Sequence, residues 1–87
     1  MAKWIKTNGL IENVKPANGT DFSLEELQGF VNGYVEIVRF PNKHDLIMIV
    51  DDEGALKDDK AINWQASSVV GQFIFGNVLI CKNEEVK

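Results

Sequence analysis

The chain has 87 residues, of which 45% are apolar, and its nine basic and 13 acidic side chains give a net charge of −4. This length supplies one hydrophobic core, so we expect a single domain over residues 1–87. The basic residues are scattered singly, whereas a protein that binds nucleic acid usually carries a basic patch. The charge pattern therefore argues against direct binding of DNA or RNA.

Two features of the sequence bear on its compartment. The N-terminus lacks the apolar segment of a signal peptide, and no apolar run approaches the ~20 residues that span a bilayer. The single cysteine, Cys81, excludes an intrachain disulfide and ends an apolar run, which predicts a small buried side chain rather than a reactive thiol. We therefore expect a cytoplasmic protein that does not enter a membrane.

The first predicted element is a β-hairpin. Two β-prone runs, 4–7 and 10–15, flank the dipeptide Asn8-Gly9. Asn-Gly is typical of a two-residue type I′ turn, in which both central residues have positive φ. The turn residues 16–19 then end the second strand.

A helix is predicted to begin at Ser23. Ser23 and Glu26 have the spacing of a capping box. Gly33 is suited to the left-handed conformation after the last turn, and Gly29 inside the helix is expected to permit close approach to a sheet. The apolar residues expected on the buried face are Leu24, Leu27, Phe30 and Val31.

Two apolar strands should follow as an antiparallel hairpin. Residues 34–40 are apolar on both faces, which is typical of a strand at the centre of a sheet. Residues 41–45 have the composition of a turn, and 46–50 form the second buried strand. An acidic turn over 51–54 closes it.

The last third of the chain predicts a short helix and a final strand. Residues 57–60 read as a solvated loop, and Asn63 is expected to cap a helix over 64–70 that ends at Gly71. The final strand over 73–81 should break at Gly76, and 83–87 form a charged tail that we expect to fray. The residues expected to face the core from the short helix are Ala66, Val69 and Val70. The fold class is therefore α+β, a small mainly antiparallel sheet of about five strands with two short helices.

No residue pattern predicts catalysis, a metal or a cofactor. The carboxylates over 51–59 are dense, but Ala55 and Leu56 occupy positions where a calcium loop needs oxygen ligands, and no glutamate closes the loop. We read these residues as a solvated turn. His44 lies alone in a turn, and the serines at 67–68 lack the pattern of a nucleophile elbow. We expect a protein that is not an enzyme.

The two tryptophans, Trp4 and Trp64, are candidates either for core packing or for contact with a partner. Trp64 is the more suggestive because it stands at a helix start beside a charged loop. If the protein is an interaction module, we expect this edge to be its surface. The candidate residues are Trp64, Lys57, Asp58, Asp59, Lys60 and Asn63.

Three blocks stand in a characteristic order: 23–28 with 31–38, then 49–54, then 76–81, with Asn63 and Ala66 in an Asn-x-x-Ala spacing before the last. Together they resemble the family called domain of unknown function 3846, small proteins common in phages, plasmids and other bacterial mobile elements. Asn77 stands where that family often has aspartate. The resemblance implies an accessory protein of a mobile element and carries over no catalytic residue.

Two functions remain open. The first is a non-enzymatic interaction protein with a host protein as its partner. The second is a small-ligand or nucleotide-sequestering protein, whose site the loops 42–45 and 51–59 would line, either within one chain or across a dimer interface. A phosphate ligand would require Lys43, Lys57 or Lys60 to converge on it.

Overall fold

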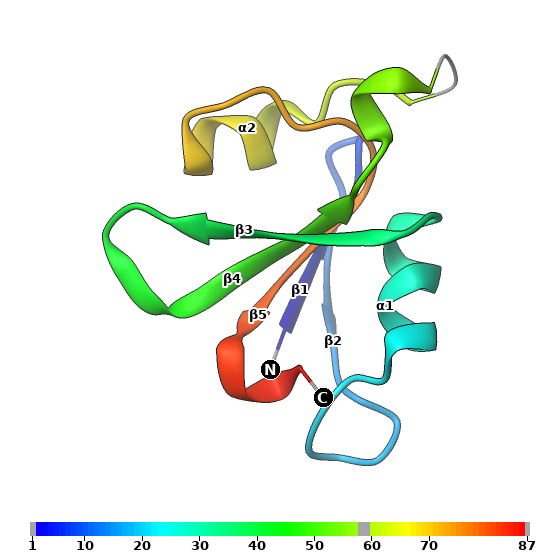
Figure 1. The fold of residues 1–87 in the computed structure, drawn as a ribbon, viewed down its shortest axis with the longest axis vertical. Coiled ribbons are helices and arrows are strands. Elements are labelled where there is room, and N and C mark those ends of the chain that lie inside the picture. Colours follow the sequence, from blue (N-terminus) through cyan, green and yellow to red (C-terminus); the bar gives the residue numbers. More distant parts are fainter. Residues whose placement is uncertain (1, 58–59, 87) are drawn as a thin grey trace.

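The structure is a computed structural model that describes residues 2–57 and 60–86. Five strands form one antiparallel sheet in the order β2-β1-β5-β4-β3, with a helix against each face (Figure 1). This arrangement confirms the predicted α+β class. The elements are β1 (Ala2–Ile5), β2 (Ile11–Val14), α1 (Leu24–Val31), β3 (Val35–Phe40), β4 (Lys43–Asp51), α2 (Trp64–Val70) and β5 (Val78–Lys82), with short 3₁₀ turns at Gly54–Leu56 and Asn83–Glu85.

The N-terminal hairpin is confirmed, but its turn is not type I′. Gly9 has a φ of 92° and donates its N–H to the carbonyl of Lys6, whereas Asn8 has no positive φ. The side-chain oxygen of Asn8 instead accepts the N–H of Leu10 at 3.0 Å. The side chain of Asn8 thus stabilises a three-residue loop in which glycine alone is left-handed.

Helix α1 begins as predicted. Ser23 Oγ accepts the N–H of Glu26 at 3.2 Å, and Glu26 Oε1 accepts the N–H of Ser23 at 2.9 Å, so the capping box is confirmed. Leu27 and Val31 are buried, but the prediction that Leu24 faces the core is wrong, since it is exposed. The fully buried Phe22, one residue before the cap, fills the core at this end of the helix instead.

The predicted roles of Gly29 and Gly33 are both wrong. Asn32, with a φ of 58°, takes the left-handed position that was predicted for Gly33. A Cβ at Gly33 would lie 2.6 Å from Asp51 Oδ1, so this glycine is needed for close approach. A Cβ at Gly29 would meet nothing within 4 Å. The close approach that requires a glycine is therefore the one between Gly33, after the end of α1, and Asp51, and it does not involve Gly29 inside the helix.

Strands β3 and β4 pair as predicted, but β3 lies at the edge of the sheet and not at its centre. Its residues are apolar on both faces because Val35 packs on the α1 side while Val38 and Phe40 pack on the α2 side. The predicted turn over 41–45 is also too long, since β4 already begins at Lys43.

The core consists of two clusters on opposite faces of the sheet. Side chains of β4 alternate between them: Ile47 and Ile49 pack towards α1, while Met48 packs towards α2. The predicted burial of Cys81 is confirmed, and burial together with the nearby charge of Glu85 raises the pKa of its thiol to about 11. This thiol is therefore protonated at neutral pH and unreactive.

Helix α2 ends at Gly71 as predicted, with a φ of 76°. Ala66 is buried and Val70 packs on the second cluster, but the prediction for Val69 is wrong, because one step along a helix rotates a side chain by about 100° and leaves Val69 exposed. The chain breaks before β5 at Gly76 (φ 85°), as expected.

Residues 83–86 are held against the domain, contrary to the prediction that they fray. The carbonyl of Glu85 accepts the N–H of Phe22 at 2.6 Å, and Phe22 forms an isolated bridge with Val86. This segment therefore closes over the start of α1. No helix among residues 2–57 and 60–86 is long and apolar enough to cross a membrane.

Candidate interaction surface

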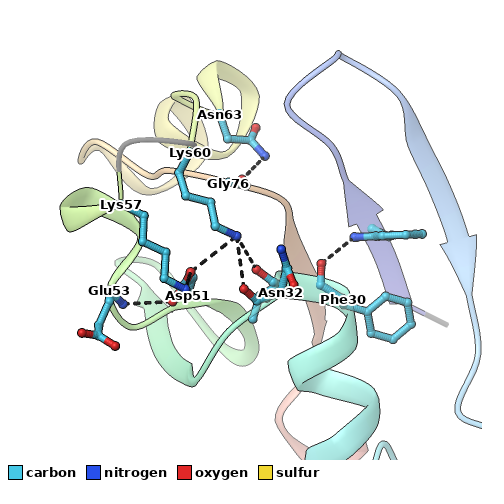
Figure 2. Close-up of polar contacts among 10 residues, drawn as sticks. Phe30, Asn32, Asp51, Glu53, Lys57, Lys60, Asn63 and Gly76 are labelled. Atoms are coloured by element: carbon cyan, nitrogen blue, oxygen red, sulfur yellow. Dashed lines mark hydrogen bonds and ion pairs between the residues drawn. The ribbon is translucent and has the colours of Figure 1, made fainter.

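Asp51, at the end of β4, is the centre of a buried polar network (Figure 2). Its Oδ2 lies 2.8 Å from Lys57 Nζ and 3.4 Å from Lys60 Nζ. Its Oδ1 accepts the backbone N–H of Glu53 at 3.0 Å. The prediction that Asp51 belongs to a solvated turn is therefore wrong.

The electrostatics of this network keep Asp51 ionised. Burial raises the pKa of the Asp51 carboxyl, but the hydrogen bonds from Lys57 and Glu53 and the charges of Lys57 and Lys60 outweigh burial, so the pKa is lowered overall. The carboxylate neutralises two ammonium groups that follow it closely in the chain. It is consequently unsuited to act as a proton-transfer group at neutral pH.

Lys60 also connects the loop to the end of α1. Its Nζ donates to the carbonyl of Val31 at 2.9 Å and approaches that of Asn32 at 3.4 Å. A positive charge is favourable at a helix C-terminus. Lys57 and Lys60 therefore point inward, contrary to the predicted solvated loop, while the predicted residues Asp58 and Asp59 lie outside the described part of the chain.

Asn63 caps α2 as predicted and is almost fully buried. Its Oδ1 accepts the N–H of Ala66 at 3.1 Å, and its Nδ2 donates to the carbonyls of Ile5 and Gly76, each at 3.0 Å. Both amide hydrogens are thus used inside the protein. Asn63 positions the start of α2 and does not present a polar group to a partner.

Trp64 lies directly after this buried cap and is 68% exposed. It lines an open groove of about 440 Å³ together with Phe73, which is itself 72% exposed. The groove is lined by Trp64, Ser67, Ser68, Gly71, Gln72 and Phe73. The structure therefore places two large aromatic side chains beside one apolar depression.

Phe73 was not among the predicted surface residues, because residues 73–75 were assigned to the final strand. The chain reverses at the left-handed Gly71, and the N–H of Ile74 donates to Ser67 Oγ at 2.8 Å. This hydrogen bond holds residues 72–74 against α2. The sequence feature that could have indicated an exposed Phe73 is its position two residues after Gly71, the glycine that ends α2.

Trp4, the other tryptophan, has a structural role. Its Nε1–H donates to the carbonyl of Phe30 at 3.0 Å, and its ring meets that of Phe30 edge-to-face with centroids 5.2 Å apart. The sequence left core packing and partner contact open for both tryptophans. In the structure, Trp4 packs against the core, whereas Trp64 is exposed.

Within one chain, the described residues of the predicted ligand site do not lie together, and residues 58 and 59 of that site lie outside the described part of the chain. Residues 42–45 and the loop after Asp51 lie at opposite ends of β4 (Figure 1). Lys43 therefore cannot join Lys57 and Lys60, which converge on Asp51. Within residues 2–57 and 60–86, no group of three or more His, Cys, Asp or Glu side chains is arranged to hold a metal ion.

Fold and surface together define a small α+β domain with an exposed aromatic groove on its second helix. Residues 8–87 match the family model described as Domain of unknown function (DUF3846), so the chain belongs to that family, in agreement with the resemblance inferred from its sequence blocks. Comparisons with curated proteins and with solved structures gave no match.

Proposed function

We propose that this protein is a non-enzymatic accessory protein of a mobile genetic element that binds a host protein in the cytoplasm. The observation that carries the proposal is the exposure of Trp64 and Phe73, two large aromatic side chains that line one apolar groove. Tryptophan is enriched among the residues that dominate binding energy at protein interfaces. A depression between two such rings can seat a partner's side chain.

The rigidity of the surroundings supports this proposal. Asn63 fixes the start of α2 to β1 and to the segment before β5. Ser67 Oγ is hydrogen-bonded to the backbone of Asn63, directly before Trp64, and of Ile74, directly after Phe73. Trp64 and Phe73 are therefore displayed by a preorganised backbone. Preorganisation lowers the conformational entropy that is lost on binding.

The internal use of the reactive groups supports a non-enzymatic role. Ser67 Oγ donates to the carbonyl of Asn63 at 2.8 Å and accepts the N–H of Ile74, so its hydroxyl is fully engaged. The Asp51 carboxylate is held by two lysines, and the exposed His44 lies at the other end of β4. Nucleophile, base and orienting group are thus not brought together among these residues.

The test is capture of a partner from host lysate by the tagged chain, followed by mass spectrometry and measurement of affinity for the purified partner. We expect Trp64→Ala and Phe73→Ala each to weaken binding by about 2 kcal/mol or more, roughly 30-fold. Leu56→Ala is the matched control, because Leu56 is 81% exposed but does not line the groove. Equal affinity for the wild type and both groove variants would refute the proposal.

A nucleotide or other small ligand is the second candidate function. The groove volume lies within the range of small-molecule sites, which supports it, but the engagement of Lys57 and Lys60 with Asp51 leaves them poorly placed for a phosphate. A thermal-shift screen with nucleotides tests this alternative, since a ligand at 100 times its Kd adds ~2.7 kcal/mol of stability. Unchanged melting across the screen would eliminate it.

A further inference from the structure

The aromatic groove continues into a second, smaller hollow that is acidic. This hollow, of about 140 Å³, lies between the ends of β3 and β4 and the segment before β5. Gln72 and Phe73 line both depressions, so the two form one surface. The acidic residues that line the hollow are Glu36, Asp51 and Asp52.

Two of these three acidic residues have no neutralising partner in the part of the chain that the structure describes. Glu36 pairs across the sheet with Val50, which packs on the α2 side, so the Glu36 side chain lies on that side too. Asp52, in the turn after β4, lines the same hollow. Both residues are exposed, and neither carboxylate forms a hydrogen bond or ion pair within residues 2–57 and 60–86. Asp51, in contrast, is neutralised by Lys57 and Lys60.

We infer that the partner presents a large apolar side chain for the groove and, beside it, an arginine or lysine for the hollow. This inference rests on the proposed function and specifies the chemistry of its partner. Glu36 and Asp52 supply two negative charges to a bound cation, and the Phe73 ring at the boundary offers a cation–π contact. Complementary charge of this kind contributes to specificity and to the rate of association.

The acidic margin distinguishes this partner from other occupants of an aromatic groove. Exposed aromatic rings also stack on the bases of single-stranded nucleic acid, but such sites track the phosphates with basic residues. Here the unneutralised groups next to the rings are carboxylates, which repel phosphate. A basic-apolar protein segment therefore fits the combined surface.

The experiment selects short random peptides from a displayed library on the immobilised full chain, with counter-selection on Trp64→Ala. We expect the enriched peptides to combine a large apolar residue with a nearby arginine or lysine. Binding of one enriched peptide is then compared between the wild type and Glu36→Gln/Asp52→Asn. We expect the double variant to bind about tenfold more weakly at low salt, with most of that difference lost at about 0.5 M salt.

The matched control is Asp45→Asn/Glu84→Gln, which changes the net charge equally at exposed residues that line neither depression. We expect this control to bind the peptide as the wild type does. Equal weakening in both double variants would indicate a general charge effect and overturn the inference. Preserved melting of all variants is checked alongside.

The failures of the two proposals differ. Enriched peptides that lack basic residues, yet still require Trp64, would overturn the inference and leave the proposed function standing. A selection that yields no Trp64-dependent binder would overturn the inference. The proposed function would then still be tested by the capture of a host protein. Tighter binding of a single-stranded oligonucleotide to Glu36→Gln/Asp52→Asn than to the wild type would assign the groove to nucleic acid. Self-association that is lost in Trp64→Ala would assign it to a second copy of the chain.

Discussion

Lys57 and residues 60–64 have an inner and an outer side, and their chemistry is the reverse of the usual pattern. On the inner side, Lys57, Lys60 and Asn63 direct polar groups at a buried carboxylate and at backbone carbonyls. On the outer side, Trp64 exposes its ring to solvent. These residues direct polar groups inward and leave a large apolar side chain exposed. This arrangement gains no stability from burial of that side chain and is typical of a binding surface.

The largest effect should come from the inner side, at Asn63. We expect Asn63→Ala to lower the free energy of unfolding by about 3 kcal/mol, because it removes a helix cap and the amide group that donates to two backbone carbonyls in the interior. Chemical denaturation measures this change. Ser23→Ala is the control: it removes a cap from α1 without opening the interior, so it should cost ~1 kcal/mol. Equal costs would contradict the distinction between a local cap and an interior clamp.

The second effect concerns Asp51. We expect Asp51→Asn to cost about 2 kcal/mol at neutral pH, because two lysines lose their negative partner. The pKa of Asp51 is lower in the folded state than in the unfolded chain, so its stabilisation is present above the unfolded pKa of ~3.9 and is lost as pH falls through the folded value.

Denaturation of the wild type and Asp51→Asn over a range of pH tests this sign. The difference in unfolding free energy between the two proteins should be constant near neutrality and should shrink below about pH 4. A difference that grows on acidification would show that the carboxylate destabilises the fold.

A third effect separates the two glycines of the α1 region. Gly33→Ala should cost about 1.5 kcal/mol, because its Cβ would displace the Asp51 carboxylate. Gly29→Ala should instead stabilise the protein by up to ~1 kcal/mol, because the site is open and the residue is helical. Melting of the two variants in opposite directions is the expected result, and a shift in the same direction would argue against the close approach at Gly33.

The smallest effect on stability belongs to the outer side. Trp64→Ala should change the free energy of unfolding by no more than about 0.5 kcal/mol, as is usual for an exposed side chain. Trp4→Ala is the comparison and should cost about 3 kcal/mol, because Trp4 packs on Phe30 and donates to its carbonyl. A large loss of stability in Trp64→Ala would assign that ring to packing.

The features that the sequence predicts well are those whose partners are close in the chain. The caps at Ser23 and Asn63 and the end of α2 at Gly71 depend on residues three or four positions away. Hydrophobic patterning likewise identified the buried strand that became the core of β4. These elements, and with them the fold class, follow from local rules.

The rest depends on contacts between distant residues. The inward direction of Lys57 and Lys60 requires the carboxylate of Asp51 and the end of α1, and the need for Gly33 arises from the same carboxylate. The edge position of β3 depends on the strand order, which no short pattern encodes. For the candidate surface, Trp64 was predicted, but its partner Phe73 depended on the reversal at Gly71.

The alternation of side chains along the two central strands has a consequence for cooperativity. Met48 and Val78 belong to the cluster beneath α2, while the adjacent Ile49 and Leu79 belong to the cluster beneath α1. The same backbone supports both clusters, so neither half can open without disrupting the other, and the domain should unfold in one transition. A partner seated on α2 would therefore slow amide hydrogen exchange on the opposite face, beneath α1, where it makes no contact.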